Sequence, residues 1–131
     1  VNVINVALGK EGSYGSMDEY EVKIDRGQSV RVVRGENVIS EFDIPTPDVI
    51  KIDVEGMELD VLRGIESILS KNTPRMILCE VHPDYIHPSA LSQEEIKELK
   101  EILHKNGFYV IEVGKDHEYG TQPCLFCKHD K

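Results

Sequence analysis

The second half of the chain alternates between segments with the pattern of strands and segments with the pattern of amphipathic helices. Residues 49–54 and 75–81 are rich in apolar side chains, and residues 57–70 repeat apolar side chains every three or four positions. A second helical pattern, over residues 92–107, is followed by the strand-like segment "FYVIEV". Strands that alternate with helices form parallel sheets through right-handed crossovers. The sequence therefore predicts an α/β fold.

Signals at the ends of the second helical segment support this assignment. Ser92 and Glu95 have the spacing of a capping box, in which each residue satisfies a backbone N–H of the other. Gly107 is suited to end the helix. The segment "PCLFCKH" predicts a last strand, which a polar turn near Gly120 joins to the strand before it.

The first half of the chain predicts more strands. Val1–Leu8 has a strand pattern, and residues 37–44 fit a short strand or a turn. The segments "YEVKID" and "SVRVV" alternate with a period of two and are joined by "RGQ", which predicts a β-hairpin. The length of 131 residues fits a single domain over residues 1–131.

Composition narrows the classes of function. A net charge of −9 argues against a nucleic-acid partner, since such proteins usually carry a basic patch. No apolar run reaches the roughly 20 residues that a membrane span needs, and no targeting pattern is present. Three cysteines do not make a disulfide framework. These features predict a cytoplasmic protein with neither a nucleic-acid nor a membrane partner.

Four ionisable side chains follow the two predicted buried strands. Asp53 and Glu55 follow the first strand, and Glu80 and His82 follow the second. The carboxyl ends of neighbouring parallel strands meet at one edge of the sheet, where ligands bind. A charge in a buried sheet is costly unless it is paired or functional. We therefore predict that these four residues form a binding or catalytic site, in which a carboxylate or an imidazole can accept a proton.

Structural explanations stay open for two of these residues. The positive end of a helix favours a carboxylate, so Glu55 could simply cap the helix that follows. His82 precedes Pro83, and hydrogen bonds alone could satisfy its ring.

The sequence resembles a known family. The segments "VIKIDVEGMELDVLRG", "RMILCEVHP" and "LKEILHKNGFYVIEV" closely resemble the FkbM-type methyltransferases, in the same order, and "VNVINVALGKEG" resembles the third strand of that family. The resemblance implies a partial class I methyltransferase sheet, which is Rossmann-like and mostly parallel, with an antiparallel final strand and an inserted hairpin. It also implies S-adenosylmethionine as the methyl donor and a hydroxyl oxygen of a small metabolite or sugar as the acceptor.

The chain departs from this family in one respect. The glycine-rich loop after the first strand of the family, and the acid that binds the ribose, have no counterpart. The glycines of "GKEGSYG" are not followed by a helical pattern, as a nucleotide-binding loop would be. We therefore expect the chain to be the C-terminal portion of a methyltransferase fold, excised from a longer protein. By itself it should bind S-adenosylmethionine weakly or not at all and should be inactive.

The resemblance also implies roles for individual residues. Asn5, Ala7 and Leu8, at the end of the first strand, would line the adenine pocket, and Asp53 would contact the cofactor or the acceptor. Asp53 and Glu80 resemble the metal-binding carboxylates of catechol-type O-methyltransferases, whose oxygen ligands suit Mg²⁺. Spacing alone does not establish such a site, and no metal is predicted.

Other interpretations were weighed against this one. Cys124 and Cys127 could form half of a zinc site, but residues three apart in a strand face opposite sides, which favours buried apolar cysteines. The segment "DVEGMELDVLRGI" faintly resembles a receiver domain, with Asp53 as phosphoacceptor, although "VNVINVAL" lacks the acidic pair that receivers need. A non-enzymatic interaction module with a methyltransferase-like sheet is the main alternative.

The class I strand order, 3-2-1-4-5-7-6, leads to an expectation about assembly. Without strands one and two, residues 49–54 lose a neighbour, and an unpaired apolar edge recruits another strand. Either Val1–Leu8 pairs there within the chain, or two chains pair edge to edge. We expect a homodimer.

Overall fold

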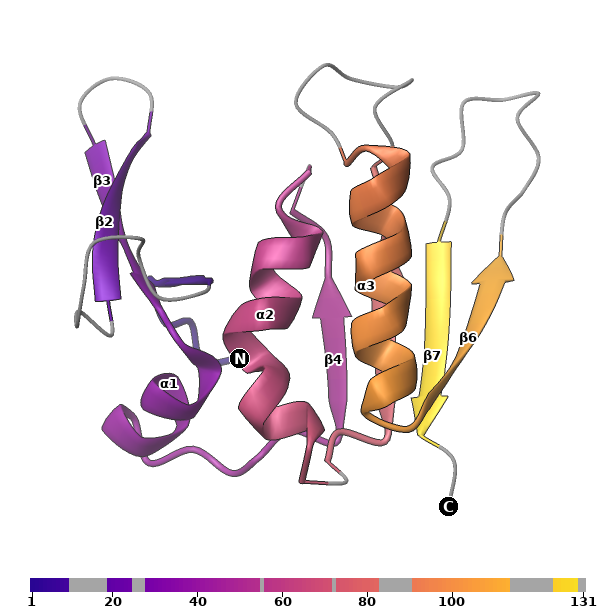
Figure 1. Ribbon diagram of the computed structural model, residues 1–131. Helices are drawn as coiled ribbons and strands as arrows, with labels where there is room; N and C mark the ends of the chain where they lie inside the picture. Colours follow the sequence, from indigo (N-terminus) through magenta and orange to yellow (C-terminus); the bar gives the residue numbers. More distant parts are fainter. Residues whose placement is uncertain are drawn as a thin grey trace.

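The computed structural model contains two β-sheets and three helices among the residues it describes (Figure 1). The described residues are 1–9, 19–24, 28–54, 56–71, 73–82, 91–113 and 124–129. The predicted α/β class is confirmed. No helix in these ranges is both long enough and apolar enough to span a membrane.

The larger sheet has four strands in the order β4-β5-β7-β6. β4 (Val49–Ile52) and β5 (Met76–Glu80) are parallel, with Ile52 opposite Cys79. β7 (Cys124–His129) lies between β5 and β6 (Phe108–Val113) and is antiparallel to both. This mixed sheet places the carboxyl ends of β4 and β5 side by side.

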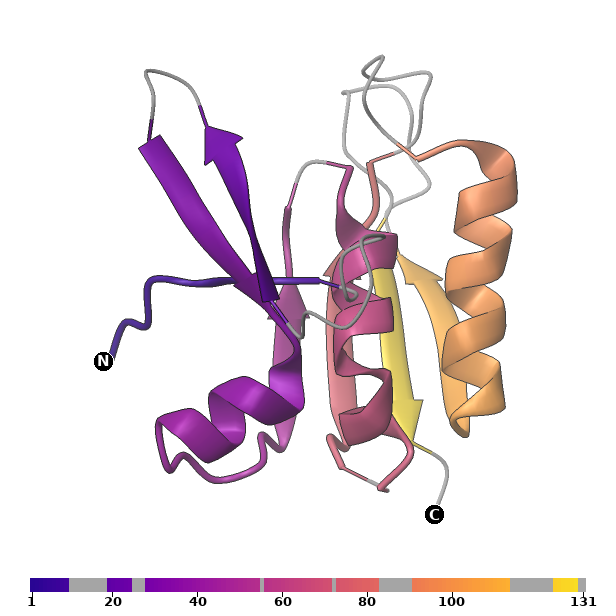
Figure 2. The same ribbon diagram turned by 60° about the vertical axis from the view of Figure 1, so that its left-hand side comes forward.

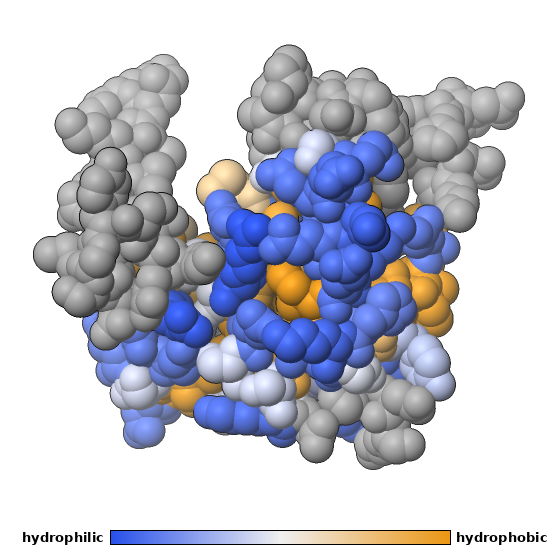
Figure 3. All heavy atoms as spheres, viewed as in Figure 1, coloured by the Kyte–Doolittle hydropathy of each residue, from blue (hydrophilic) through white to orange (hydrophobic). Residues whose placement is uncertain are grey.

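Two helices cover one face of this sheet (Figures 1 and 2). They are α2 (Glu58–Leu69) and α3 (Gln93–Lys105), which follow β4 and β5. Their apolar sides and the inward side chains of the sheet form the core, in which Leu62, Ile77 and Leu99 are fully buried. The outer surfaces of the helices are mostly hydrophilic (Figure 3).

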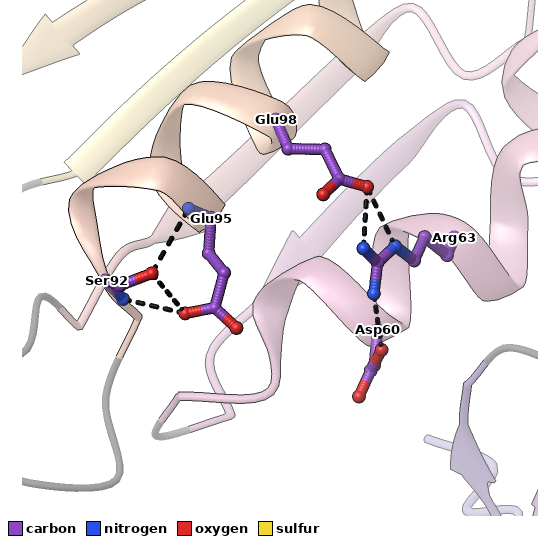
Figure 4. Close-up of polar contacts among 5 residues, drawn as sticks. All are labelled: Asp60, Arg63, Ser92, Glu95 and Glu98. Atoms are coloured by element: carbon purple, nitrogen blue, oxygen red, sulfur yellow. Dashed lines mark hydrogen bonds and ion pairs between the residues drawn. The ribbon is translucent and has the colours of Figure 1, made fainter.

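Polar contacts fix α3 against α2 (Figure 4). The predicted capping box is confirmed: Ser92 Oγ accepts the Glu95 N–H at 3.3 Å, and Glu95 Oε2 accepts the Ser92 N–H at 2.8 Å. Arg63 on α2 donates to Glu98 on α3 at 2.6 Å and to Asp60 at 3.2 Å. The helix ends before Gly107, whose φ of 82° is a conformation that suits glycine.

The smaller sheet has three strands in the order β1-β3-β2. β2 (Glu19–Ile24) and β3 (Gln28–Val33) are antiparallel, and β1 (Ala7–Leu8) runs parallel to the end of β3. A helix, α1 (Gly35–Glu41), follows β3 and packs closely on α2. A Cβ atom at Gly35 would lie 2.7 Å from Ile68 Cδ1, so this crossing has no room for a larger side chain.

Two predictions about the first half were wrong. The strand expected over Val1–Leu8 includes only Ala7–Leu8, which pair with Val32 and Val33. Just before them, the Val6 N–H donates to the carbonyl oxygen of Ile4 at 3.0 Å, a local turn that interrupts the extended chain. Residues 37–44 do not form a strand or an isolated turn. Their first part belongs to α1, because its buried residues, Gly35 and Val38, are three apart and share the face that packs on α2.

Candidate functional site

Three of the four predicted catalytic side chains meet beyond the carboxyl ends of β4 and β5. Asp53 follows β4, Glu80 ends β5, and His82 comes two residues later. One polar atom from each side chain lies within 4.8 Å of the others. The predicted proximity of these three residues is confirmed, while their roles stay a prediction. Glu55, the fourth, lies outside the described residues.

The turn between β4 and α2 brings another carboxylate to the site. Gly56 has a φ of 97°, which lets the backbone reverse from the strand into the helix. Its N–H donates to Oε1 of Glu58 at 3.1 Å. Glu58 is the first residue of α2, and its side chain is fully buried.

Glu58 contacts the imidazole of His82. Its Oε1 lies in short hydrogen-bonding contact with Nδ1 of His82, a ring that is only 5% exposed. Because Nδ1 is engaged by Glu58, Nε2 is the ring nitrogen that stays available to a ligand at this cluster. The arrangement resembles a base oriented by a third group, as in many sites of acid–base catalysis.

The sequence held a signal for Glu58 that the predictions missed. In the helix predicted over residues 57–70, the apolar side chains that share one face are Val61, Leu62, Ile65, Ile68 and Leu69. Glu58 lies three and four residues before the first two of these, on the same face. An acid where the helical pattern calls for an apolar side chain is an anomaly that points to a buried polar role.

The pKa of Asp53 is affected mainly by Lys51, two residues earlier in the chain. Lys51 Nζ donates to Asp53 Oδ2 at 2.8 Å. This hydrogen bond is the main reason that the pKa of Asp53 lies below its usual range, and the charges of Lys51 and His82 act in the same direction. Asp53 is therefore a carboxylate at neutral pH, ready to accept a hydrogen bond from a ligand.

The cluster of Asp53, Glu80 and His82 is compact enough to share a cation. However, the ammonium of Lys51 already provides a positive charge against Asp53. That the site holds no metal stays a prediction. Cys124 and Cys127 both belong to β7, and the side chain of Cys124 lies outside the described part of the structure, so the prediction that the cysteines hold no zinc is not tested either. Cys127 is fully buried opposite Ile77.

The residues predicted to line the adenine pocket lie in the other sheet. Asn5 precedes β1 and is exposed, whereas Ala7 and Leu8 form β1, and Leu8 packs partly against the main core. None of the three belongs to the cluster around Asp53. The chain just after β1 approaches α2 closely, since a Cβ atom at Gly64 would lie 2.5 Å from the carbonyl oxygen of Gly9. Their contact with a cofactor stays a prediction.

Comparison with known proteins identifies the family of this chain. The sequence model described as "Methyltransferase FkbM domain" matches residues 4–110, well over half of the chain. The chain belongs to the FkbM methyltransferase family, as the sequence predicted.

Two particular proteins are similar to this chain. The hexuronic acid methyltransferase AglP of Haloferax volcanii is 29% identical over 63 residues, which cover 48% of this chain and 26% of AglP. The crystal structure of methyltransferase FkbM from Methylobacillus flagellatus KT matches with a TM-score of 0.66 and 18% identity, over 96% of this chain and 28% of that protein. The chain thus matches little more than a quarter of the length of either protein.

Proposed function

We propose that this chain forms the acceptor side of an S-adenosylmethionine-dependent methyltransferase that methylates a hydroxyl oxygen of a sugar or another small metabolite. The observation that carries the proposal is the meeting of Asp53, Glu80 and the buried His82 at one end of the parallel strands. Family membership supports methyl transfer as the reaction.

The order of the strands supports S-adenosylmethionine as the methyl donor. In the class I order, 3-2-1-4-5-7-6, the larger sheet corresponds to strands 4-5-7-6. On this assignment β1 would be strand three, with strands one and two supplied from outside these 131 residues. The complete protein would then hold the cofactor, and the isolated chain would bind it weakly and be inactive. We place the protein in the cytoplasm, where buried cysteines stay reduced.

The side chains of the cluster can perform the proton transfer that the reaction requires. As the acceptor oxygen forms its bond to the methyl carbon, the bond from that carbon to the sulfonium sulfur breaks. The acceptor O–H gives its proton to Nε2 of His82, and Asp53 or Glu80 accepts a hydrogen bond that orients the hydroxyl. General-base catalysis of this kind contributes about 10²–10⁴ in rate.

The charge of the site favours a hydroxyl over a carboxylate as the acceptor. AglP is named for hexuronic acid, a sugar that carries both kinds of oxygen. Asp53 and Glu80 would repel an acceptor carboxylate, whereas a neutral hydroxyl can donate to them. We therefore propose a sugar hydroxyl, and the product would be a methyl ether.

The experiment uses the complete protein with methyl-labelled S-adenosylmethionine and a hexuronic-acid saccharide. Asp53→Asn and His82→Gln should each lower turnover by about a hundredfold or more, in line with the loss of a positioned acid–base group. Asp60→Asn, a charge change in the first turn of α2, is the matched control and should retain turnover. Wild-type turnover in both test variants would reject the assignment of the site.

The product itself tests the acceptor. A methyl ether keeps its label in mild alkali, whereas a methyl ester loses it. An alkali-labile product would show that the carboxylate is the acceptor and that no base is needed.

A non-enzymatic interaction module is the second candidate function. It is favoured by exposed apolar side chains on one face of the larger sheet, among them Tyr109, Ile111 and Val113. Calorimetry with S-adenosylhomocysteine separates the candidates, because the complete protein binds it only if it is a methyltransferase.

A further inference from the structure

Glu58 is a buried acid for which the proposed chemistry gives no direct role. Among the described residues, Glu58 and His82 are the buried polar side chains, at 0% and 5% exposure. They come from different elements, since Glu58 begins α2 and His82 follows β5. Asp53, in contrast, is exposed.

Packing alone does not explain an acid at this position. Glu58 shares a helix face with Leu62 and Ile65, where an apolar residue would bury well. Its Oε1 accepts from Gly56, but its buried Oε2 has no hydrogen-bond partner among the described residues. A buried carboxylate with an unsatisfied oxygen destabilises a fold unless another interaction offsets the cost.

The contact with His82 supplies that interaction. Oε1 of Glu58 accepts the Gly56 N–H at 3.1 Å, and a hydrogen on Nδ1 of His82 lets the same oxygen accept from the ring as well. A neutral imidazole carries one hydrogen, so a proton on Nδ1 leaves a lone pair on Nε2. In this tautomer Nε2 can accept a proton from a ligand held by Asp53 and Glu80.

We infer that Glu58 is a positioning residue that holds His82 in the Nδ1–H tautomer and stabilises the imidazolium formed during methyl transfer. The inference rests on the proposed function, in which His82 is the base. When the acceptor proton reaches Nε2, the ring gains a positive charge, and the carboxylate of Glu58 already lies against Nδ1. Glu58 neither gains nor loses a proton in this step.

Other charged groups also face the ring. Asp53 approaches from the end of β4 and Glu80 from the end of β5, and Lys51 is paired with Asp53. Asp53 and Glu80 are more exposed than Glu58, so water screens them more strongly. The variants below therefore change Glu58 alone.

The first test measures the tautomer directly, in the 131-residue chain, by nitrogen-15 NMR of the imidazole rings. His82→Gln assigns the signal among the five histidines. We expect the Nδ1–H form in the wild type and in Glu58→Gln, which keeps an accepting oxygen. Glu58→Leu should lose that preference, and Asp60→Asn should keep it. The Nε2–H form in the wild type, or an unchanged tautomer in Glu58→Leu, would overturn the inference.

The second test measures turnover of the complete protein against pH, together with unfolding of each variant. Glu58→Leu should lower turnover by at least about tenfold. This is a part of the rate factor of about 10²–10⁴ that a general base contributes. Glu58→Gln should retain more turnover than Glu58→Leu at every pH, because its amide oxygen can still accept the hydrogen bond from Nδ1. A role in packing alone would instead make turnover follow stability.

The two tests separate the inference from the proposed function. If His82→Gln keeps wild-type turnover while the tautomer depends on Glu58, then the proposed base is wrong and the structural contact stands. If His82→Gln is inactive but both Glu58 variants turn over normally, the proposed base stands and the inference about Glu58 fails.

Discussion

The two faces of the four-stranded sheet differ more in their surroundings than in their side chains. Toward α2 and α3, Ile77 and Phe108 are at most 2% exposed. On the opposite face, Val49, Tyr109 and Ile111 are 51–55% exposed, although they alternate with buried residues in the same strands. Apolar side chains on both faces are typical of a sheet that is buried on both sides. The strands are therefore suited to a second cover that the described elements do not provide.

The candidate site takes residues from both sides of this division. Asp53 and Glu80 lie on the side of the uncovered face, because each comes two residues after a residue of that face, Lys51 in β4 and Leu78 in β5. Glu58 comes from the helix that covers the other face. The covered side thus supplies a buried acid, and the other side supplies one exposed and one half-buried carboxylate.

Truncating a core side chain should have the largest effect on stability. Leu62→Ala removes a fully buried side chain of α2 and should destabilise the fold by about 2–5 kcal/mol, because it leaves a cavity. Ile111→Ala on the uncovered face should cost less than about 1 kcal/mol, since half of that side chain already contacts water. Urea unfolding of both variants measures the contrast, and equal losses would show that something covers the second face.

Cys127 in β7 gives a second test of the covered face, because its side chain is fully buried there. Cys127→Ser places a hydroxyl among apolar side chains and should destabilise by about 1–3 kcal/mol, while Cys127→Ala should cost less because no polar group is buried. Thermal unfolding of the pair tests this order. We also expect the purified protein to carry no zinc, and a stoichiometric amount by elemental analysis would overturn that expectation.

A substitution at the N-terminus of α3 should destabilise one of the two helices that cover the first face. Ser92→Ala removes the cap and should destabilise by about 1 kcal/mol at pH 7. Hydrogen bonds from the hydroxyl and the backbone N–H of Ser92 hold the pKa of Glu95 below its usual 4.5. A carboxyl with a lowered pKa contributes stability above its unfolded pKa and loses it as the pH falls through its folded pKa. The difference between wild type and Ser92→Ala should therefore shrink below about pH 4.5. A difference that does not change down to pH 3 would contradict the role of Glu95.

The second half of the fold could be predicted from sequence because its signals are local. The period of three to four residues located α2 and α3, and the spacing of Ser92 and Glu95 gave the start of the latter. Parallel pairing of β4 and β5 then brought Asp53, Glu80 and His82 together without further information.

The remaining features depend on contacts that local patterns do not specify. β1 is short because a turn at Ile4–Val6 interrupts the chain before it, and α1 depends on a close crossing with α2 at Gly35. Glu58 was missed because a helix face was assigned by its apolar members. The acid among them becomes significant only once His82 is placed beside it.

The smallest effect on folding should come from the edge of β4, where we expect the largest effect on assembly. β4 is the end strand of its sheet, and β1 pairs with β3 instead of joining it, so pairing by Val1–Leu8 within the chain does not occur. Two chains that meet along β4 would satisfy its backbone and bury Val49. We therefore expect a homodimer by light scattering.

Val49→Lys should weaken the dimer about tenfold or more, because an edge charge opposes strand pairing. The same substitution should change the free energy of unfolding by less than about 0.5 kcal/mol, as is usual for surface positions. Lys97→Ala on the outer side of α3 is the control and should leave the dimer unchanged. A monomer at high concentration would contradict the expected homodimer.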